Sequence, residues 1–251
     1  MRPIRFSSGD LHHLHHLLCC VAAALLLISL AAPAHAGRNV AEWDQELAEV
    51  REKLHEQDYK KAKKLCRSLL KDFDFWIFDG PAANRLLGQT LAFRAVAELG
   101  LGHPEDAVWD FTVAQAIYPE LLAEHLPAVG AGGEALQQAV EKHQEELDGL
   151  VVPENCDSVA PPRGSRSKAP EIPMALYERF RAEMGTVVVQ LYINAEGTPE
   201  AFLLPEPPRF PTAAISIAEF MREAEFRPAS CDGESVPSHY QISYDFSVIR
   251  R

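Results

Sequence analysis

The chain has 251 residues, of which 47% are apolar and 24% are charged, a balance typical of folded proteins and unlike disordered or collagen-like chains. Its 36 acidic residues outnumber its 24 basic ones, which gives a net charge of -12. The broad positive surface that nucleic-acid binding requires is therefore absent, and we expect neither DNA nor RNA as a partner.

The N-terminal segment has the pattern of an export signal. Arg2 and Arg5 precede an apolar run over residues 17–30, and the small-residue ending Ala34-His35-Ala36 follows it. The pattern predicts a signal peptide over residues 1–36, cleaved after Ala36. The alternative is an uncleaved inner-membrane anchor, and only in that case would the protein contact a membrane, since this run is the sole stretch suited to one.

Residues 37–150 have helical periodicity and predict four or more helices, the first over Val40 to His55. In the segment from Gly102 to Pro119, Ala107, Phe111, Ala114 and Pro119 are spaced as in the second helix of a tetratricopeptide repeat, which the segment resembles. A weaker copy has Ala62, Cys66 and Leu69 at the corresponding places.

An insertion is expected over about residues 75–85 and a capping helix over residues 121–147. A plain helical bundle is the alternative. The one basic cluster, between Lys60 and Lys71, is expected to be a solvated helix face.

A connector rich in Pro and Ser is expected over residues 151–172, because this stretch has neither helical nor strand periodicity. Three cysteines follow the predicted cleavage site, and an odd count in an exported protein suggests one disulfide and one buried thiol. Cys156 and Cys231 are the predicted pair. Cys66 is the predicted free thiol, on the apolar side of a helix.

Residues 173–251 predict a small α+β module. A strand is expected over Thr186 to Asn194, a turn at residues 195–197 and a second strand over residues 199–204. An amphipathic helix is expected over residues 212–226 and a half-buried last strand over Tyr240 to Val248. The expected fold class for the whole chain is α+β, with N-terminal helical hairpins and a C-terminal three-stranded antiparallel sheet.

The C-terminal module resembles the C-terminal domain of TonB-type energy transducers of Gram-negative bacteria. The resemblance covers about residues 173–248 and depends on the order of the segment 185–197, the helix, Phe226-Arg227-Pro228-Ala229 and the strand ending at Val248. Two motifs depart from the family: Ile172-Pro173 stands where a Tyr-Pro pair is common, and the Pro-rich stretch 205–211 replaces a Ser-Ser-Gly segment.

This resemblance implies a periplasmic protein that binds an extended peptide of an outer-membrane receptor by adding it as a strand beside the last strand. The implied partner-binding residues are Gln241, Ser243, Asp245 and Ser247. The competing interpretation is that these four residues are only the solvated face of a sheet.

Sequence motifs for catalysis, metal binding or cofactor binding were not found, so no cofactor and no enzymatic activity are expected. The leading hypothesis is a periplasmic protein-interaction factor in receptor-linked transmembrane transport. A membrane-anchored energy transducer is the first alternative, and a hydrolase or redox protein with an unrecognised site is the second.

Overall fold

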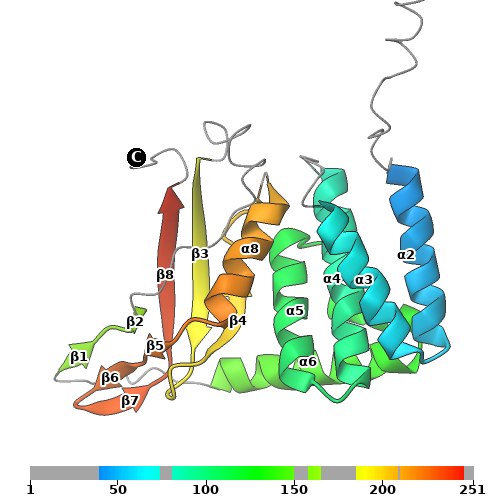
Figure 1. Ribbon diagram of the computed structural model, residues 1–251. Coiled ribbons are helices and arrows are strands. Elements are labelled where there is room, and N and C mark those ends of the chain that lie inside the picture. Colours follow the sequence, from blue (N-terminus) through cyan, green and yellow to red (C-terminus); the bar gives the residue numbers. More distant parts are fainter. Residues whose placement is uncertain (1–39, 74–80, 150–157, 165–184, 209, 246–251) are drawn as a thin grey trace, which may run out of the picture. The chain divides into compact units, whose positions relative to one another are not determined.

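The structure is a computed structural model that describes residues 40–73, 81–149, 158–164, 185–208 and 210–245 (Figure 1). The predicted signal peptide lies outside these residues. Within the described ranges the chain has an α+β fold: helices make up the N-terminal part, and an antiparallel sheet with one further helix makes up the C-terminal part. No helix of the described residues is both long and apolar enough to cross a membrane.

Two helical hairpins form the N-terminal part. Helices α2 (Val40–His55) and α3 (Tyr59–Phe73) form the first hairpin, and α4 (Pro81–Gly100) and α5 (Pro104–Ile117) form the second. The predicted first helix is confirmed at both ends. Proline stands at the first position of α4 and α5, where the missing backbone N–H costs no helical hydrogen bond.

The positions that carry the repeat-like pattern are buried in both hairpins. Ala107, Phe111 and Ala114 of α5 are fully buried, as are Ala62 and Cys66 of α3. Small side chains at these places let paired helices approach closely. The pattern therefore correctly identified residues that pack between helices, while membership in the tetratricopeptide family stays a prediction.

The predicted capping helix over residues 121–147 is wrong as a single element. The structure has a short 3-10 helix, η1 (Ala123–Val129), and then helix α6 (Ala131–Gly149). Gly130, whose φ is 86°, separates the two, and Pro127 lies inside η1. Neither residue suits the interior of a continuous α-helix.

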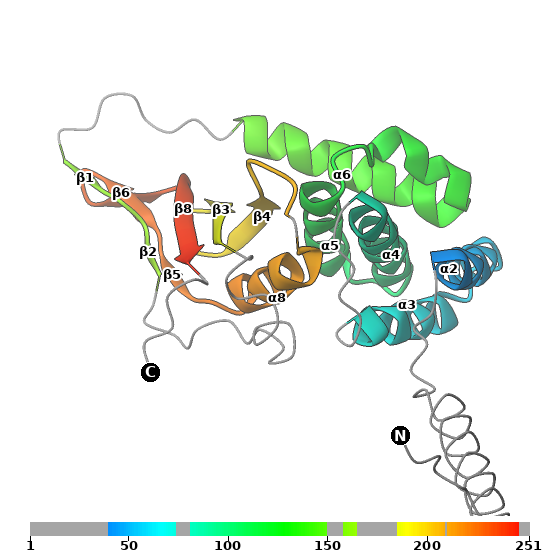
Figure 2. The ribbon, with the colours of Figure 1, turned by 90° about the horizontal axis from the view of Figure 1, so that it is seen from above.

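The central sheet has three antiparallel strands: β3 (Thr186–Ile193), β4 (Pro199–Leu203) and β8 (Ser238–Asp245), in the order β4-β3-β8. Helix α8 (Pro211–Arg222) lies against one face of this sheet (Figures 1 and 2). Its apolar stripe, which includes Ala214, Ile217 and Met221, belongs to the same core as Val189 and Leu191 of β3. The predicted helix over residues 212–226 is too long at its C-terminus: Phe226 belongs to a strand.

The predicted turn after β3 is confirmed. Gly197 has a φ of 88°, and the Asn194 side chain accepts hydrogen bonds from the backbone N–H groups of Glu196 (3.0 Å) and Thr198 (2.8 Å). An Asn side chain that binds the backbone ahead of it is a common way to fix such a turn. The turn aligns β4 with β3.

The expectation of unpaired chain over residues 151–172 is wrong at four residues. Strand β1 (Val159–Ala160) pairs with β6 (Ala229–Cys231), and β2 (Arg163–Gly164) pairs with β5 (Phe226–Arg227). Strand β7 (Glu234–Val236) completes a hairpin with β6. This part of the predicted connector is therefore bound to the C-terminal module.

Helices and sheet share one continuous core within residues 39–251. The rings of Trp109 in α5 and Phe202 in β4 lie 6.2 Å apart in an edge-to-face arrangement, and Arg222 of α8 forms an ion pair with Asp106 of α5. Strand β4 is thus held on one side by β3 and on the other by α5.

Candidate functional site: the β8 edge and the polar face of the sheet

The two outer strands of the sheet differ in what covers them. On the outer side of β4, the Phe202 backbone N–H donates a hydrogen bond to Thr112 Oγ1 of α5 (3.3 Å). On the outer side of β8, no strand of the described residues is paired. Among the described residues, β8 is therefore the edge of this sheet that carries no further strand.

The register shows which backbone groups of β8 face outward. The Phe202 N–H points away from β3, so the β4 residues on either side of it are the ones whose backbone groups bond to Gln190 and Tyr192 of β3. Backbone groups alternate in direction along a strand. The backbone N–H and C=O groups of the odd-numbered residues of β3 therefore point toward β8. Leu191 and Val189 lie opposite Tyr240 and Ile242. The backbone groups of Gln241 and Ser243 must then point outward, and no hydrogen bond within the described chain reaches their N–H groups.

Three of the four predicted partner-binding residues lie on this strand, as expected from their alternation. Gln241, Ser243 and Asp245 are exposed on one face of the sheet, while Tyr240, Ile242 and Tyr244 are half-buried on the other. The Gln241 side chain accepts a hydrogen bond from Gln190 Nε2 (3.2 Å). Ser247 lies outside the described residues. The geometry brings three of the four together, and their role in binding stays a prediction.

Sequence analysis missed a cleft on the same face of the sheet. Its volume is about 230 Å³, and it lies between this face and helices α5 and α6. Figures 1 and 2 show the C-terminal half of α6 extending past α5 toward the sheet. Tyr192 of β3, His239 of β8 and His143 of α6 line it. These residues come from three separated segments, so no local sequence motif could have marked them.

The two predicted bridge cysteines are not both described. Cys231 is in β6, and Cys156 lies outside the described residues. Ser158, two residues after Cys156, exchanges hydrogen bonds with Asp232: the Asp232 N–H donates to the Ser158 carbonyl (2.9 Å), and the Ser158 N–H donates to Asp232 Oδ1 (2.8 Å). This pairing brings the chain next to Cys156 alongside Cys231, and the disulfide stays a prediction.

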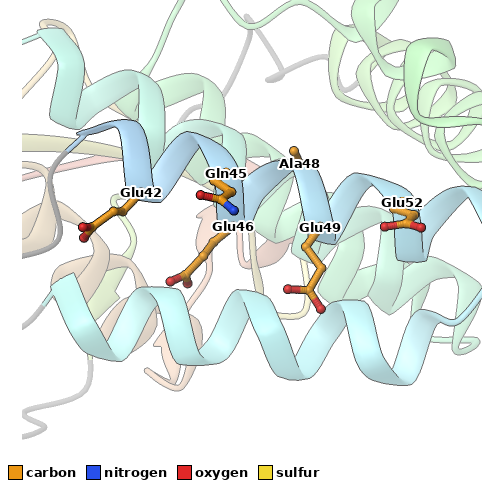
Figure 3. A pocket seen from close by; sticks show the side chains of 6 residues that line it. All are labelled: Glu42, Gln45, Glu46, Ala48, Glu49 and Glu52. Carbon is orange, nitrogen blue, oxygen red and sulfur yellow. The ribbon is translucent and has the colours of Figure 1, made fainter.

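A second hollow follows the outer face of α2, with a volume of about 490 Å³. It is lined by the residues drawn in Figure 3, which are Glu42, Gln45, Glu46, Ala48, Glu49 and Glu52. Glu46 and Glu49 extend toward the neighbouring helix α3, where Lys61 Nζ lies 3.8 Å from Glu49 Oε1. Lys61 of the basic cluster therefore pairs with an acid of its own hairpin, as expected for a solvated helix face, whereas Lys63 pairs with Glu98 of α4, where both side chains are mostly buried.

A cluster at the α4–α5 turn has the residue types of a cation site. Ligand atoms of Glu98, His103 and Asp106 all lie within 4.8 Å of one another. However, Lys63 Nζ donates to Glu98 Oε2 at 2.6 Å, and Arg222 pairs with Asp106. Two cations thus already balance the two carboxylates, which makes this cluster an ionic contact between helices rather than a metal site.

Comparison with protein-family models, curated proteins and solved structures found no match. The functional argument for this chain therefore depends on its own geometry and on the resemblance described from its sequence.

Proposed function

We propose that this protein is a periplasmic protein-interaction factor that captures an extended peptide of a membrane-receptor partner by strand addition at β8, in receptor-linked transport. The observation that carries the proposal is the pair of outward-facing backbone groups at Gln241 and Ser243, on the sheet edge that no described strand covers. An added strand gains affinity from main-chain hydrogen bonds, and pockets for its alternate side chains give specificity.

The side chains beside this edge also suit an extended ligand. Gln241, Ser243 and Asp245 are exposed and polar, so a partner strand would meet hydrogen-bonding groups at every second residue. The net charge of -12 favours a partner segment that is neutral or basic, because like charges across an interface raise the cost of association.

The register gives a sharp test by proline substitution. Ser243→Pro removes an outward-facing backbone N–H and leaves the bonds between β8 and β3 in place, while Tyr244→Pro removes a donor from the β8–β3 ladder. A display library of ten-residue peptides is selected against the wild-type protein, and the enriched peptides are titrated against each variant. We expect Ser243→Pro to reduce affinity at least tenfold and Ser243→Ala to leave it within about twofold.

Circular dichroism and melting curves accompany the titrations as controls. Ser243→Pro should keep a cooperative melt, whereas Tyr244→Pro should lose stability. If folded Ser243→Pro binds the selected peptides as tightly as Ser243→Ala, strand addition at β8 is wrong.

Export is the second part of the proposal, and it depends on residues 1–36, which lie outside the described chain. Mass spectrometry of the native protein should find a mature N-terminus at Gly37. A protein that retains Met1 to Ala36 would favour the membrane-anchored transducer instead.

A further inference from the structure

The cleft between the sheet and helices α5 and α6 contains buried polar atoms that form no hydrogen bond with the described part of the chain. Tyr192 is 5% exposed, yet its hydroxyl finds no hydrogen-bond partner among the described residues, and the same holds for the buried Nε2 atom of His143. Both residues line the cleft. Burying such a group without a partner destabilises the fold, so a ligand that forms hydrogen bonds with both atoms would recover this loss.

Three other polar side chains that line the cleft already form hydrogen bonds. Thr112 Oγ1 donates to the Trp109 carbonyl (2.9 Å) and accepts from the Phe202 N–H, and Gln115 Nε2 donates to the Leu121 carbonyl (3.2 Å). Gln144 Nε2 donates to Asp148 Oδ1 (2.8 Å). Among the described residues that line the cleft, the buried polar atoms without a hydrogen-bond partner are the Tyr192 hydroxyl and His143 Nε2.

We propose that this cleft binds a small uncharged molecule that carries a hydroxyl or carboxamide group on a compact apolar body. A tyrosine hydroxyl and a histidine ring nitrogen can each donate or accept, and a hydroxyl or carboxamide offers both complementary roles in one group. Val108, Val140 and Leu203 supply apolar walls, and His239 lies edge-to-face on Tyr192 with ring centroids 4.9 Å apart.

Charge and size narrow the ligand class. Among the described residues, no Lys or Arg lines the cleft and Asp148 does, so a carboxylate or phosphate would lose its hydration without gaining a permanently charged cationic partner. Burial raises the pKa of Tyr192, with Glu200 adding to the effect, so the hydroxyl keeps its proton as a donor. A volume of about 230 Å³ is below the range of drug-sized pockets, about 300–1,000 Å³, which favours a compact ligand.

The test uses four small aromatic probes of similar shape: benzyl alcohol and benzamide, which are uncharged and polar, toluene, which is apolar, and benzoate, which is anionic. Binding is followed by NMR titration of the full chain. We expect benzyl alcohol and benzamide to shift the Tyr192 and His143 signals and to bind about tenfold more tightly than toluene or benzoate. Equal binding of toluene and benzyl alcohol would overturn the proposal.

Tyr192→Phe is the matched variant, because it removes the hydroxyl and preserves the ring that contacts His239. It should weaken benzyl alcohol about tenfold, leave toluene unchanged, and keep or raise the melting temperature without ligand. A large loss of thermal stability would show that the hydroxyl already has an internal partner and would contradict the proposal.

This site uses the face of the sheet and is independent of the outer edge of β8. Ser243→Pro should therefore bind benzyl alcohol as the wild type does. If peptide binding fails and probe binding survives, strand addition alone is wrong; if the probes fail and the peptides bind, the cleft proposal alone is wrong.

Discussion

Cys66 is fully buried, and burial raises the pKa of its thiol to about 12. The thiolate is the reactive form, so a water-soluble thiol reagent at pH 8 should not modify Cys66 in the folded protein and should modify it rapidly in denaturant. Thiol titration with and without denaturant checks this. Rapid labelling of Cys66 in the native protein would contradict the buried position.

The same thiol makes stability depend on pH in the alkaline range. Above the ordinary pKa of 9.0 the unfolded chain loses the proton while the folded chain keeps it, so the free energy of unfolding falls as pH rises from about 9 toward about 12. The slope should approach 1.4 kcal/mol per pH unit for this group. Urea melts of the wild type and of Cys66→Ala between pH 8 and pH 11 measure it, and the wild type should show the steeper decline.

Two Arg–Asp pairs in the helical part differ mainly in burial. Arg94 Nε donates to Asp110 Oδ2 (2.6 Å) where both side chains are mostly buried, at 16% and 5% exposed. Arg85 contacts Asp44 (3.0 Å) at 33% and 48% exposed. Asp110→Asn should cost about 3–5 kcal/mol, because it removes the hydrogen-bonded counter-charge of a buried guanidinium. Asp44→Asn should cost at most about 1 kcal/mol. Equal losses in denaturant melts would contradict this assignment.

At the scale of elements, two glycines in tight turns allow a matched comparison. Gly197 and Gly233 have φ values of 88° and 90°, so alanine at either position incurs a backbone penalty of about 1–2 kcal/mol. A Cβ at Gly197 would also collide with the Phe226 carbonyl oxygen, whereas a Cβ at Gly233 meets nothing within 4 Å. Gly197→Ala should therefore lower the melting temperature more than Gly233→Ala. The reverse order would show that the turn does not pack on β5.

The elements that sequence patterns predicted well are those whose own residues repeat with a clear period. Strand β3 places Val187, Val189, Leu191 and Ile193 at every second residue, and β8 alternates between half-buried and exposed residues. Helix α2 has an apolar face that includes Trp43, Leu47, Val50 and Leu54. Strands β1 and β2 are only two residues long and are stabilised by partners far along the chain, so they carry no period. The β6–β7 hairpin did carry a signal, the Asp232-Gly233 turn, with φ values of 53° and 90°.

The candidate sites, too, could be predicted from sequence only where a local periodic pattern marks their residues. Gln241, Ser243 and Asp245 could be predicted, because strand alternation places them on one face. Whether the outer side of their strand is covered depends on strand order, and the cleft at Tyr192 depends on where α6 ends, so neither was visible in local sequence.

At the scale of the whole molecule, the shared core predicts that helices and sheet unfold together. Phe202→Ala removes a fully buried ring that contacts Trp109 and should cost about 3–5 kcal/mol. Leu203→Ala, at a neighbouring residue that is 43% exposed, should change stability by no more than about 0.5 kcal/mol.

Circular dichroism of the helices and hydrogen exchange of the β3 amides follow the two halves separately during unfolding. Coincident transitions are expected, with both shifted to lower denaturant in Phe202→Ala. Two separate transitions would show that helices and sheet fold independently.

Because α5 covers β4 while no described strand covers β8, the sheet can be extended on one side only. A sheet open at both edges can stack copies into an unlimited ribbon, but one with a single open edge closes as soon as two copies meet across a two-fold axis. Self-association through β8 would therefore stop at a pair and would consume the edge proposed for the peptide. Such a pair would make peptide capture weaker as the protein becomes more concentrated.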